Sequence, residues 1–331
     1  MSNNCYVRSV AQVSCQQPLC NEWFTAPQFH EGTYVRAVEP SAAGVISPAE
    51  ARRMGRIQKR AVCTSFSALA ASGIGLPDAI VTGTGMGCME NSEKFLTDLT
   101  LNGERCLKPT LFMQSTHNTV SSLVAIMLKC HGYNNTYSHG ALSFDSALLD
   151  AWLQIRSGNV SSVLVGAHDE VTPSMARILA HVHPEYAFLS ETSMASVLSA
   201  DAGGGPGIVV EDVCIADNWS AVDVAACLRP EDRVIISGIN GNEHNDEPYA
   251  GVMRALGSPR TLLRYKHVFG ENFSASAMAF YVGTTLLTRQ EIPSFLFGEN
   301  CMQRYDVPLD TVTLLNHAGA DTWSVIRLRR L

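Results

Sequence analysis

A strand-to-helix turn within residues 135–158 carries the clearest chemical signal in the chain. An extended run is followed by His139-Gly140-Ala141 and then by apolar residues at helical spacing. Backbone N–H groups and the helix dipole converge at such a turn, so a thiolate placed there would be stabilised and reactive. The turn instead carries the methyl group of Ala141, which cannot act as a nucleophile.

Hydroxyl and imidazole side chains around this turn could supply other chemistry. Ser138, His139 and Ser143 lie close to Ala141 in the sequence, and His244 comes much later. A serine becomes nucleophilic when a base lies within hydrogen-bond distance. Ser138 and His139 are adjacent, so in a strand they would point to opposite faces. His244 could serve as the base if the fold brings it to the turn.

The turn and the strand expected at residues 160–167 together resemble the β-ketoacyl synthases, the condensing enzymes of fatty-acid and polyketide assembly. In that family the turn reads Thr-Ala-Cys. Counting back from Ser146-Ala147-Leu148 places the cysteine position at Ala141. The resemblance therefore implies that the position of the nucleophile is kept while the nucleophile itself is absent.

The family also uses two histidines, which bind and polarise the thioester carbonyl and assist decarboxylation. The apolar run 234–239 matches the strand before the first histidine, and Asn240 takes that histidine's place. Lys266 and Gly270 match the family's lysine and glycine, and Glu271 takes the place of the second histidine. The resemblance implies that Lys266 is retained, and we expect a buried Lys266 to form a salt bridge with Glu271.

Three further segments follow the family's order. Residues 46–54 resemble an early helix entry, residues 80–92 resemble a strand and a glycine turn before a helix, and residues 313–326 resemble the closing hairpin. In the first segment Ser47 is a plausible N-cap. The glycines of the second segment alternate at 83, 85 and 87. This spacing differs from the dinucleotide fingerprint, so we do not expect a nucleotide site.

The resemblance implies an α/β, thiolase-like fold in which two similar βαβαβ halves pack in five layers. We expect an N-terminal half at residues 1–205 and a C-terminal half at residues 206–331, joined in one compact unit. The glycine-rich stretch 201–207 marks the join, because apolar sequence resumes directly after it.

The functional hypothesis that the resemblance favours is a subunit without catalytic activity of its own. Chain-length factors share the ketosynthase core, lack the nucleophile and pair with an active ketosynthase. We expect such a heterodimer in fatty-acid, polyketide or polyene biosynthesis, with residues 109–130 in the dimer contact. The acyl-phosphopantetheine would be carried by a partner acyl-carrier protein, and we expect no cofactor on this chain.

Two alternatives belong to other functional classes. The first is an active acyltransferase or hydrolase on acyl-carrier thioesters that uses the relocated Ser138, His139, Ser143 or His244. The second is a non-enzymatic scaffold that binds an acyl-carrier protein or forms a homodimer.

The composition favours a compact cytoplasmic protein. The 331 residues are 46% hydrophobic and 17% charged, which allows a large core. The net charge of −7 disfavours nucleic-acid binding. The apolar runs are too short to cross a bilayer, and the first residues do not follow the pattern of a signal peptide.

Ten cysteines are scattered through the chain, without a C-x-x-C pair. We expect reduced, mostly buried thiols. Cys63 and Cys130 fall in apolar runs with helical character, where packing is the expected role. His181-x-His183 lacks further ligands at metal spacing, so no metal site is expected.

Overall fold

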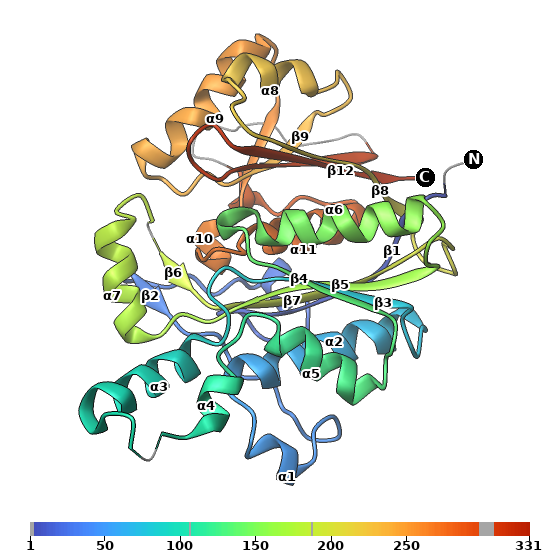
Figure 1. The fold of residues 1–331 in the computed structure, drawn as a ribbon. Helices are drawn as coiled ribbons and strands as arrows, with labels where there is room; N and C mark the ends of the chain where they lie inside the picture. Colours follow the sequence, from blue (N-terminus) through green and yellow to red (C-terminus); the bar gives the residue numbers. More distant parts are fainter. Residues whose placement is uncertain (1–2, 106, 187, 298–307) are drawn as a thin grey trace.

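A computed structural model describes residues 3–105, 107–186, 188–297 and 308–331. The elements stack in five alternating layers of helix and sheet (Figure 1). Helices α8 and α9 cover the upper half-sheet, α6 and α11 lie between the two half-sheets, and α2 and α5 cover the lower one (Figure 1). The α/β, five-layered, thiolase-like prediction is confirmed.

The large sheet contains ten strands in the part of the chain described. In spatial order, the half nearer α2 consists of β4 (Tyr133–Tyr137), β3 (Ala79–Gly83), β5 (Ser162–Asp169), β7 (Thr192–Ser199) and β1 (Tyr6–Val13). The half nearer α9 consists of β10 (Thr261–Arg264), β9 (Val234–Ser237), β11 (Thr311–His317), β12 (Trp323–Arg330) and β8 (Ile208–Ala216). The halves join where Tyr6 of β1 pairs with Val209 of β8.

The two halves repeat the same pattern of strand directions. In the first, β4, β3 and β5 run parallel, and β7 and β1 are antiparallel to their neighbours. In the second, β10, β9 and β11 run parallel, and β12 and β8 are antiparallel to theirs. The boundary at residues 205 and 206 stays a prediction, because both halves belong to one hydrogen-bonded sheet.

The helices in the layers take their positions from their apolar faces. They are α2 (Arg56–Ser72), α5 (Thr119–Leu128), α6 (Ser143–Arg156), α8 (Ala221–Cys227), α9 (Glu243–Leu256) and α11 (Ser276–Arg289). Helix α11 is buried from Ser276 to Leu287, as expected for a helix enclosed by two sheets. It contacts β1 and β7 on one side and β11 and β12 on the other.

Shorter elements complete the fold. They are α1 (Pro48–Ala51), α3 (Met89–Asn102), α4 (Pro109–Met113), α7 (Pro173–Val182), α10 (Lys266–Phe269), the 3-10 turns η1 (Glu22–Phe24), η2 (Gly140–Leu142) and η3 (Ser294–Leu296), and the paired strands β2 (Tyr34–Val35) and β6 (Leu189–Ser190). In the described residues, none of the helices has both the length and the apolar character that membrane crossing requires.

Two local predictions need correction. Strand β4 ends at Tyr137, so Ser138 and His139 lie beyond the strand and the argument from alternating strand faces does not apply to them. Cys130 follows the end of α5, where Lys129 adopts a left-handed conformation, and so lies outside the helix. The prediction of Ser47 as an N-cap is confirmed, because Ser47 and Glu50 form a capping box at the start of α1.

Candidate functional site

A cavity of about 360 Å³ lies between the ends of the two half-sheets. The turn before α6 contributes Gly140 and Ala141 to its lining, and α9 contributes His244. Lys266 of α10 and the following Glu271 also line it. The remaining lining residues are His183, Glu185, Tyr186, Asn245, Asn272, Phe273, Ala275, Ser276, Asn316, His317, Ala318 and Gly319. The fold thus brings Ala141, Lys266, Glu271 and His244 to one cavity.

The turn that carries Ala141 is held from both sides. The Asn316 side chain, at the end of β11, donates to the Ala141 carbonyl at 3.0 Å. Gly83, the last residue of β3, packs directly against the start of α6, since a Cβ there would lie 2.4 Å from the Ser143 carbonyl oxygen. These contacts fix the position of Ala141, which the sequence resemblance matches to the family's nucleophile.

Asp145, in the first turn of α6, anchors the same region from inside the core. Its buried carboxylate accepts hydrogen bonds from the hydroxyls of Ser276, at 2.6 Å, and Ser324. Asn316 Nδ2 lies 3.4 Å from the same carboxylate. Burial raises the pKa of Asp145, and the hydrogen bonds that it accepts act in the opposite direction.

Lys266, Glu271 and Asn240 form one connected polar cluster. Lys266 Nζ donates to Glu271 Oε1 at 2.6 Å, and Asn240 Nδ2 donates to Glu271 Oε2 at 2.9 Å. Asn240 Nδ2 also donates to the Glu185 carbonyl at 2.7 Å. Glu271 is only 1% exposed, which makes this an internal ion pair. The expected salt bridge is present.

This cluster leaves little capacity for thioester chemistry. A side-chain amide has two N–H donors, and those of Asn240 go to Glu185 and Glu271. The Glu271 carboxylate, bonded to Lys266, accepts hydrogen bonds and would repel a developing oxyanion, whereas an oxyanion site requires donors. The two positions matched to catalytic histidines therefore satisfy each other.

The candidate hydroxyl and imidazole groups near the turn, Ser143 and His139, are not paired with each other in the cavity. The buried Ser143 Oγ lies 2.7 Å from the Gly140 carbonyl oxygen and 3.1 Å from that of Thr84, which share its single O–H, and it accepts from the backbone N–H of His139. The His139 ring instead forms a 3.1 Å hydrogen bond with Ser146, on an exposed part of the surface. Ser143 therefore acts as a structural link between the turn and the neighbouring strand.

The histidines of the cavity have separate roles. His244 lines the cavity, as a base for the turn would have to. Its backbone N–H donates a hydrogen bond to the Asn242 side chain, which caps helix α9. The His317 ring packs against Trp323, with ring centroids 4.4 Å apart and the ring planes tilted by 41°. Burial lowers the pKa of His317; the charge of Asp321 opposes this shift, and the charge of Lys266 adds to it.

The glycine turn after β3 binds a carboxylate of the protein itself. The backbone N–H groups of Gly85 and Met86 donate to buried Asp169 at 3.0 and 3.1 Å, and the Thr84 hydroxyl donates to it at 2.8 Å. A Cβ on Gly85 would lie 2.1 Å from that of Phe273. The alternating glycines thus serve close packing and an internal anion, which agrees with the expectation that they are not a phosphate cradle.

Sequence reasoning missed Asp145, Asn316 and Asp169. Asp145 falls on the apolar side of α6, and an acidic residue at a core position of an amphipathic pattern is the available signal. Asn316 and Asp169 lie at strand ends and contact residues far away in the chain. Their roles depend on strand order, which the local pattern does not contain.

The arrangement of possible metal ligands does not support a metal site in the described part of the chain. Within the described ranges, no group of three or more His, Cys, Asp or Glu side chains is placed to hold a metal ion. The buried side-chain atoms that lack a hydrogen-bond partner in those ranges belong to residues outside the cavity lining.

Comparisons with known proteins agree on the fold. Three solved structures are similar over nearly the whole chain at low identity. One is AntDE:AntF, a type II polyketide synthase acyl-carrier protein in complex with its ketosynthase bound to the hexaketide, with 12% identity, a TM-score of 0.81 and coverage of 99% of this chain and 100% of that one. The second is the ishigamide ketosynthase/chain length factor, with 16% identity, a TM-score of 0.78 and coverage of 100% of both chains. The third is the ketosynthase ApeO in complex with its chain length factor ApeC from Xenorhabdus doucetiae, with 14% identity, a TM-score of 0.75 and coverage of 99% of this chain and 98% of that one.

Sequence comparison supplies the family. A search of curated proteins found no match. The model of the β-ketoacyl synthase N-terminal domain matches residues 22–205, more than half of the chain. This segment contains the Ala141 turn and the glycine turn after β3. The chain therefore belongs to the β-ketoacyl synthase family.

Proposed function

We propose that this chain is the non-catalytic, chain-length-factor-like subunit of a ketosynthase heterodimer in fatty-acid, polyketide or polyene biosynthesis. The observation that carries the proposal is the cluster of Lys266, Glu271 and Asn240, whose members bond to one another beside a turn that ends in Ala141. A site arranged in this way keeps its shape without a substrate and offers no group for covalent loading.

The surface around the edge strand β4 suits a partner subunit. Strand β4 ends the large sheet, so one side of its backbone has no neighbouring strand within the described chain. On α5 beside it Ile126 is 73% exposed, and on α4 Phe112 and Met113 are 59% and 69% exposed. Apolar side chains beside an open sheet edge favour association.

The family and the similar structures support a proposal about the partners. Two of these are described as ketosynthases with a chain length factor, and one as a ketosynthase with an acyl-carrier protein. We propose the same kinds of partner here, with the acyl group carried on the phosphopantetheine of the acyl-carrier protein and no cofactor on this chain. We assign the complex to the cytoplasm, in keeping with free thiols at the cysteines described.

The geometry of the cavity gives less support to the other two functional hypotheses. An acyltransferase or hydrolase would need a nucleophile paired with a base in the cavity, and the Ser143 hydroxyl is bonded to backbone groups. A scaffold that forms a homodimer would use the same β4 edge, so partner choice separates it from the heterodimer.

The test is reconstitution with a ketosynthase that keeps the Cys-His-His triad and with its acyl-carrier protein. The proposal predicts a stable complex of the two subunits and condensation products that appear only when both are present. Products of the same length from the ketosynthase alone, or a stable homodimer that ignores the ketosynthase, would contradict it. A ketosynthase with its cysteine replaced serves as the control, because it should bind this chain and form no product.

A further inference from the structure

Two cysteines outside the cavity lining, Cys214 on β8 and Cys227 on α8, pack against the same core cluster. Cys214 pairs with Val325 in the β8–β12 ladder, two residues along from the pair of Asp212 and Arg327. Residues two apart on a strand share a face, so Cys214 lies on the same face of the sheet as Asp212. Cys227 is the last residue of α8, the helix that covers this face.

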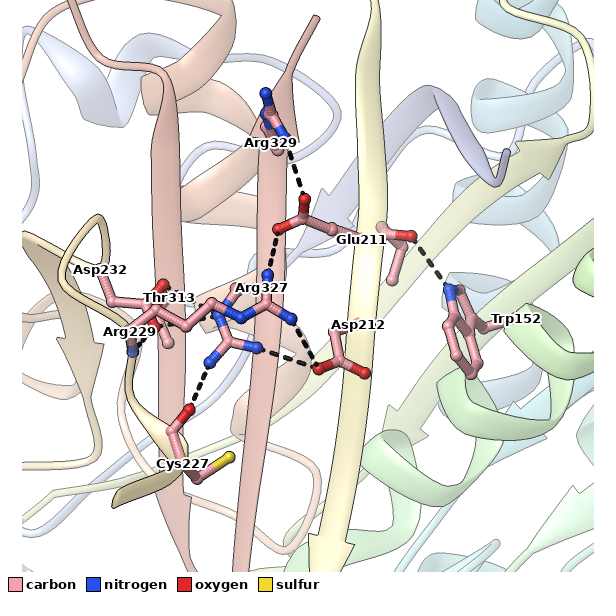
Figure 2. Close-up of polar contacts among 10 residues, drawn as sticks. Trp152, Glu211, Asp212, Cys227, Arg229, Asp232, Thr313, Arg327 and Arg329 are labelled. Carbon is pink, nitrogen blue, oxygen red and sulfur yellow. Dashed lines mark hydrogen bonds and ion pairs between the residues drawn. The ribbon is translucent and has the colours of Figure 1, made fainter. Parts of the chain in front are cut away.

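Arg327 ties the end of α8 to this part of the sheet. Its guanidinium donates to Asp212 at 3.0 Å and to the Cys227 carbonyl at 2.8 Å, and it pairs with buried Asp232 at 2.9 Å (Figure 2). Arg229 joins the same network through Asp212 (Figure 2). The buried ion pairs fix where Cys227 sits relative to β8.

The two thiols share one apolar environment. Cys214 and Cys227 are both half-buried and pack against the same core cluster, which includes Val224 and Trp323. Burial raises the pKa of the Cys214 thiol, and the adjacent Cys227 thiol raises it further.

We propose that Cys214 and Cys227 are a redox modification site that forms a reversible disulfide between β8 and the end of α8. The oxidant is a small disulfide such as oxidised glutathione. One protein thiolate attacks it and releases one glutathione thiol, and the second protein thiolate then displaces the other. One S–S bond forms in the protein, the glutathione S–S bond breaks, and two glutathione thiols leave.

Disulfide formation would reinforce a contact that Arg327 already makes. Because a disulfide restricts the unfolded chain, the oxidised protein should melt at a higher temperature than the reduced one. Because the pKa of Cys214 is raised, the rate of disulfide formation should increase with pH through the mildly alkaline range.

The experiment treats the full chain with oxidised glutathione, blocks the remaining thiols by alkylation and maps the peptides without reduction. Trypsin leaves both cysteines in one peptide that ends at Arg233, because the Arg229-Pro230 bond resists cleavage, so chymotrypsin is added to cut after Trp219. The expected result is a Cys214–Cys227 linked pair of peptides that reduction separates. The linked pair should be absent in Cys214→Ser and in Cys227→Ser.

Cys130→Ser is the matched control. Cys130 is also half-buried, but its thiol donates to the Pro77 carbonyl, so this variant should form the linked peptides as the unmodified chain does. The melting temperature of each variant under reducing conditions checks that it folds. Alkylation of both cysteines after oxidation, or separate glutathione adducts on each without a linked pair, would overturn the proposal.

Discussion

Glu271 stands where the sequence resemblance matches a histidine of the β-ketoacyl synthases, and its carboxylate connects Lys266 with Asn240. It accepts from Lys266 and from Asn240 while remaining almost fully buried. A histidine there would donate to a substrate carbonyl. The carboxylate instead accepts hydrogen bonds from its own neighbours, which supports the proposal that this site has a structural role.

Glu271→Ala should therefore destabilise the chain. The substitution leaves the Lys266 ammonium buried without its carboxylate, and breaking a buried pair in this way costs about 3 kcal/mol. Thermal and urea unfolding measure the change. Glu247→Ala is the control, since it removes a surface pair with Arg254 in which both side chains are more than half exposed. Equal melting temperatures for Glu271→Ala and the unmodified chain would contradict the structural role.

Glu170 gives a prediction about pH. Its side chain is buried between the charges of Arg60, Glu191 and Glu90, and burial raises its pKa from 4.5 to about 7. Between these two values the folded state holds a proton that the unfolded state has lost, so this residue makes stability fall as pH rises from about 4.5 to about 7.

Glu170→Gln should remove that dependence. The glutamine keeps an oxygen for the backbone N–H of Glu90, which donates to Glu170 at 2.8 Å. We expect the variant to melt at a higher temperature than the unmodified chain at pH 8 and at nearly the same temperature at pH 5. Differential scanning calorimetry at both pH values checks this, and a variant that is less stable at pH 8 would show that the charged form is favoured.

At the scale of elements, the edge strand β4 and helix α5 determine the proposed association. Ile126→Lys places a charge on α5 at a position that is 73% exposed. Folding should be unaffected, whereas binding to a ketosynthase partner should weaken at least tenfold, because the charge would be buried without a partner. Analytical ultracentrifugation of the mixed subunits measures the loss.

Ile178→Lys is the matched control for this prediction. Ile178 is 53% exposed on α7, away from the β4 edge. This variant should bind as the unmodified chain does. If both lysine variants bind equally well, the partner does not use the surface beside β4.

Most elements could be predicted because their signals are local. The turn before α6, strand β9 before Asn240 and the β11–β12 hairpin all lie where the sequence places them. The end of β4 could not be found in this way, since Ser138 and His139 differ little in pattern from the residues before them. The packing of Cys214 and Cys227 against one core cluster depends on how α8 is placed over the sheet, which sequence spacing does not reveal.

At the scale of the whole molecule, the fold repeats one arrangement of five strands twice and buries α6 and α11 between the copies. The repeat could be anticipated only through the family resemblance, because the two halves share no recognisable sequence pattern. The three positions of the site came from the same resemblance. The hydrogen bond between Asn240 and Glu271 could not be predicted from the sequence, because the two residues meet only when β9 and the segment after α10 are packed together.

Intact-protein mass spectrometry after incubation with acyl-carrier thioesters, with the chain alone and with a candidate ketosynthase, would show directly whether this chain is acylated. We predict an unchanged mass for this chain in both cases. We also predict an acyl adduct on the ketosynthase that depends on the presence of this chain. An acyl adduct on this chain would contradict the account and would identify a nucleophile, which peptide mapping could assign to Ser138, Ser143 or a cysteine.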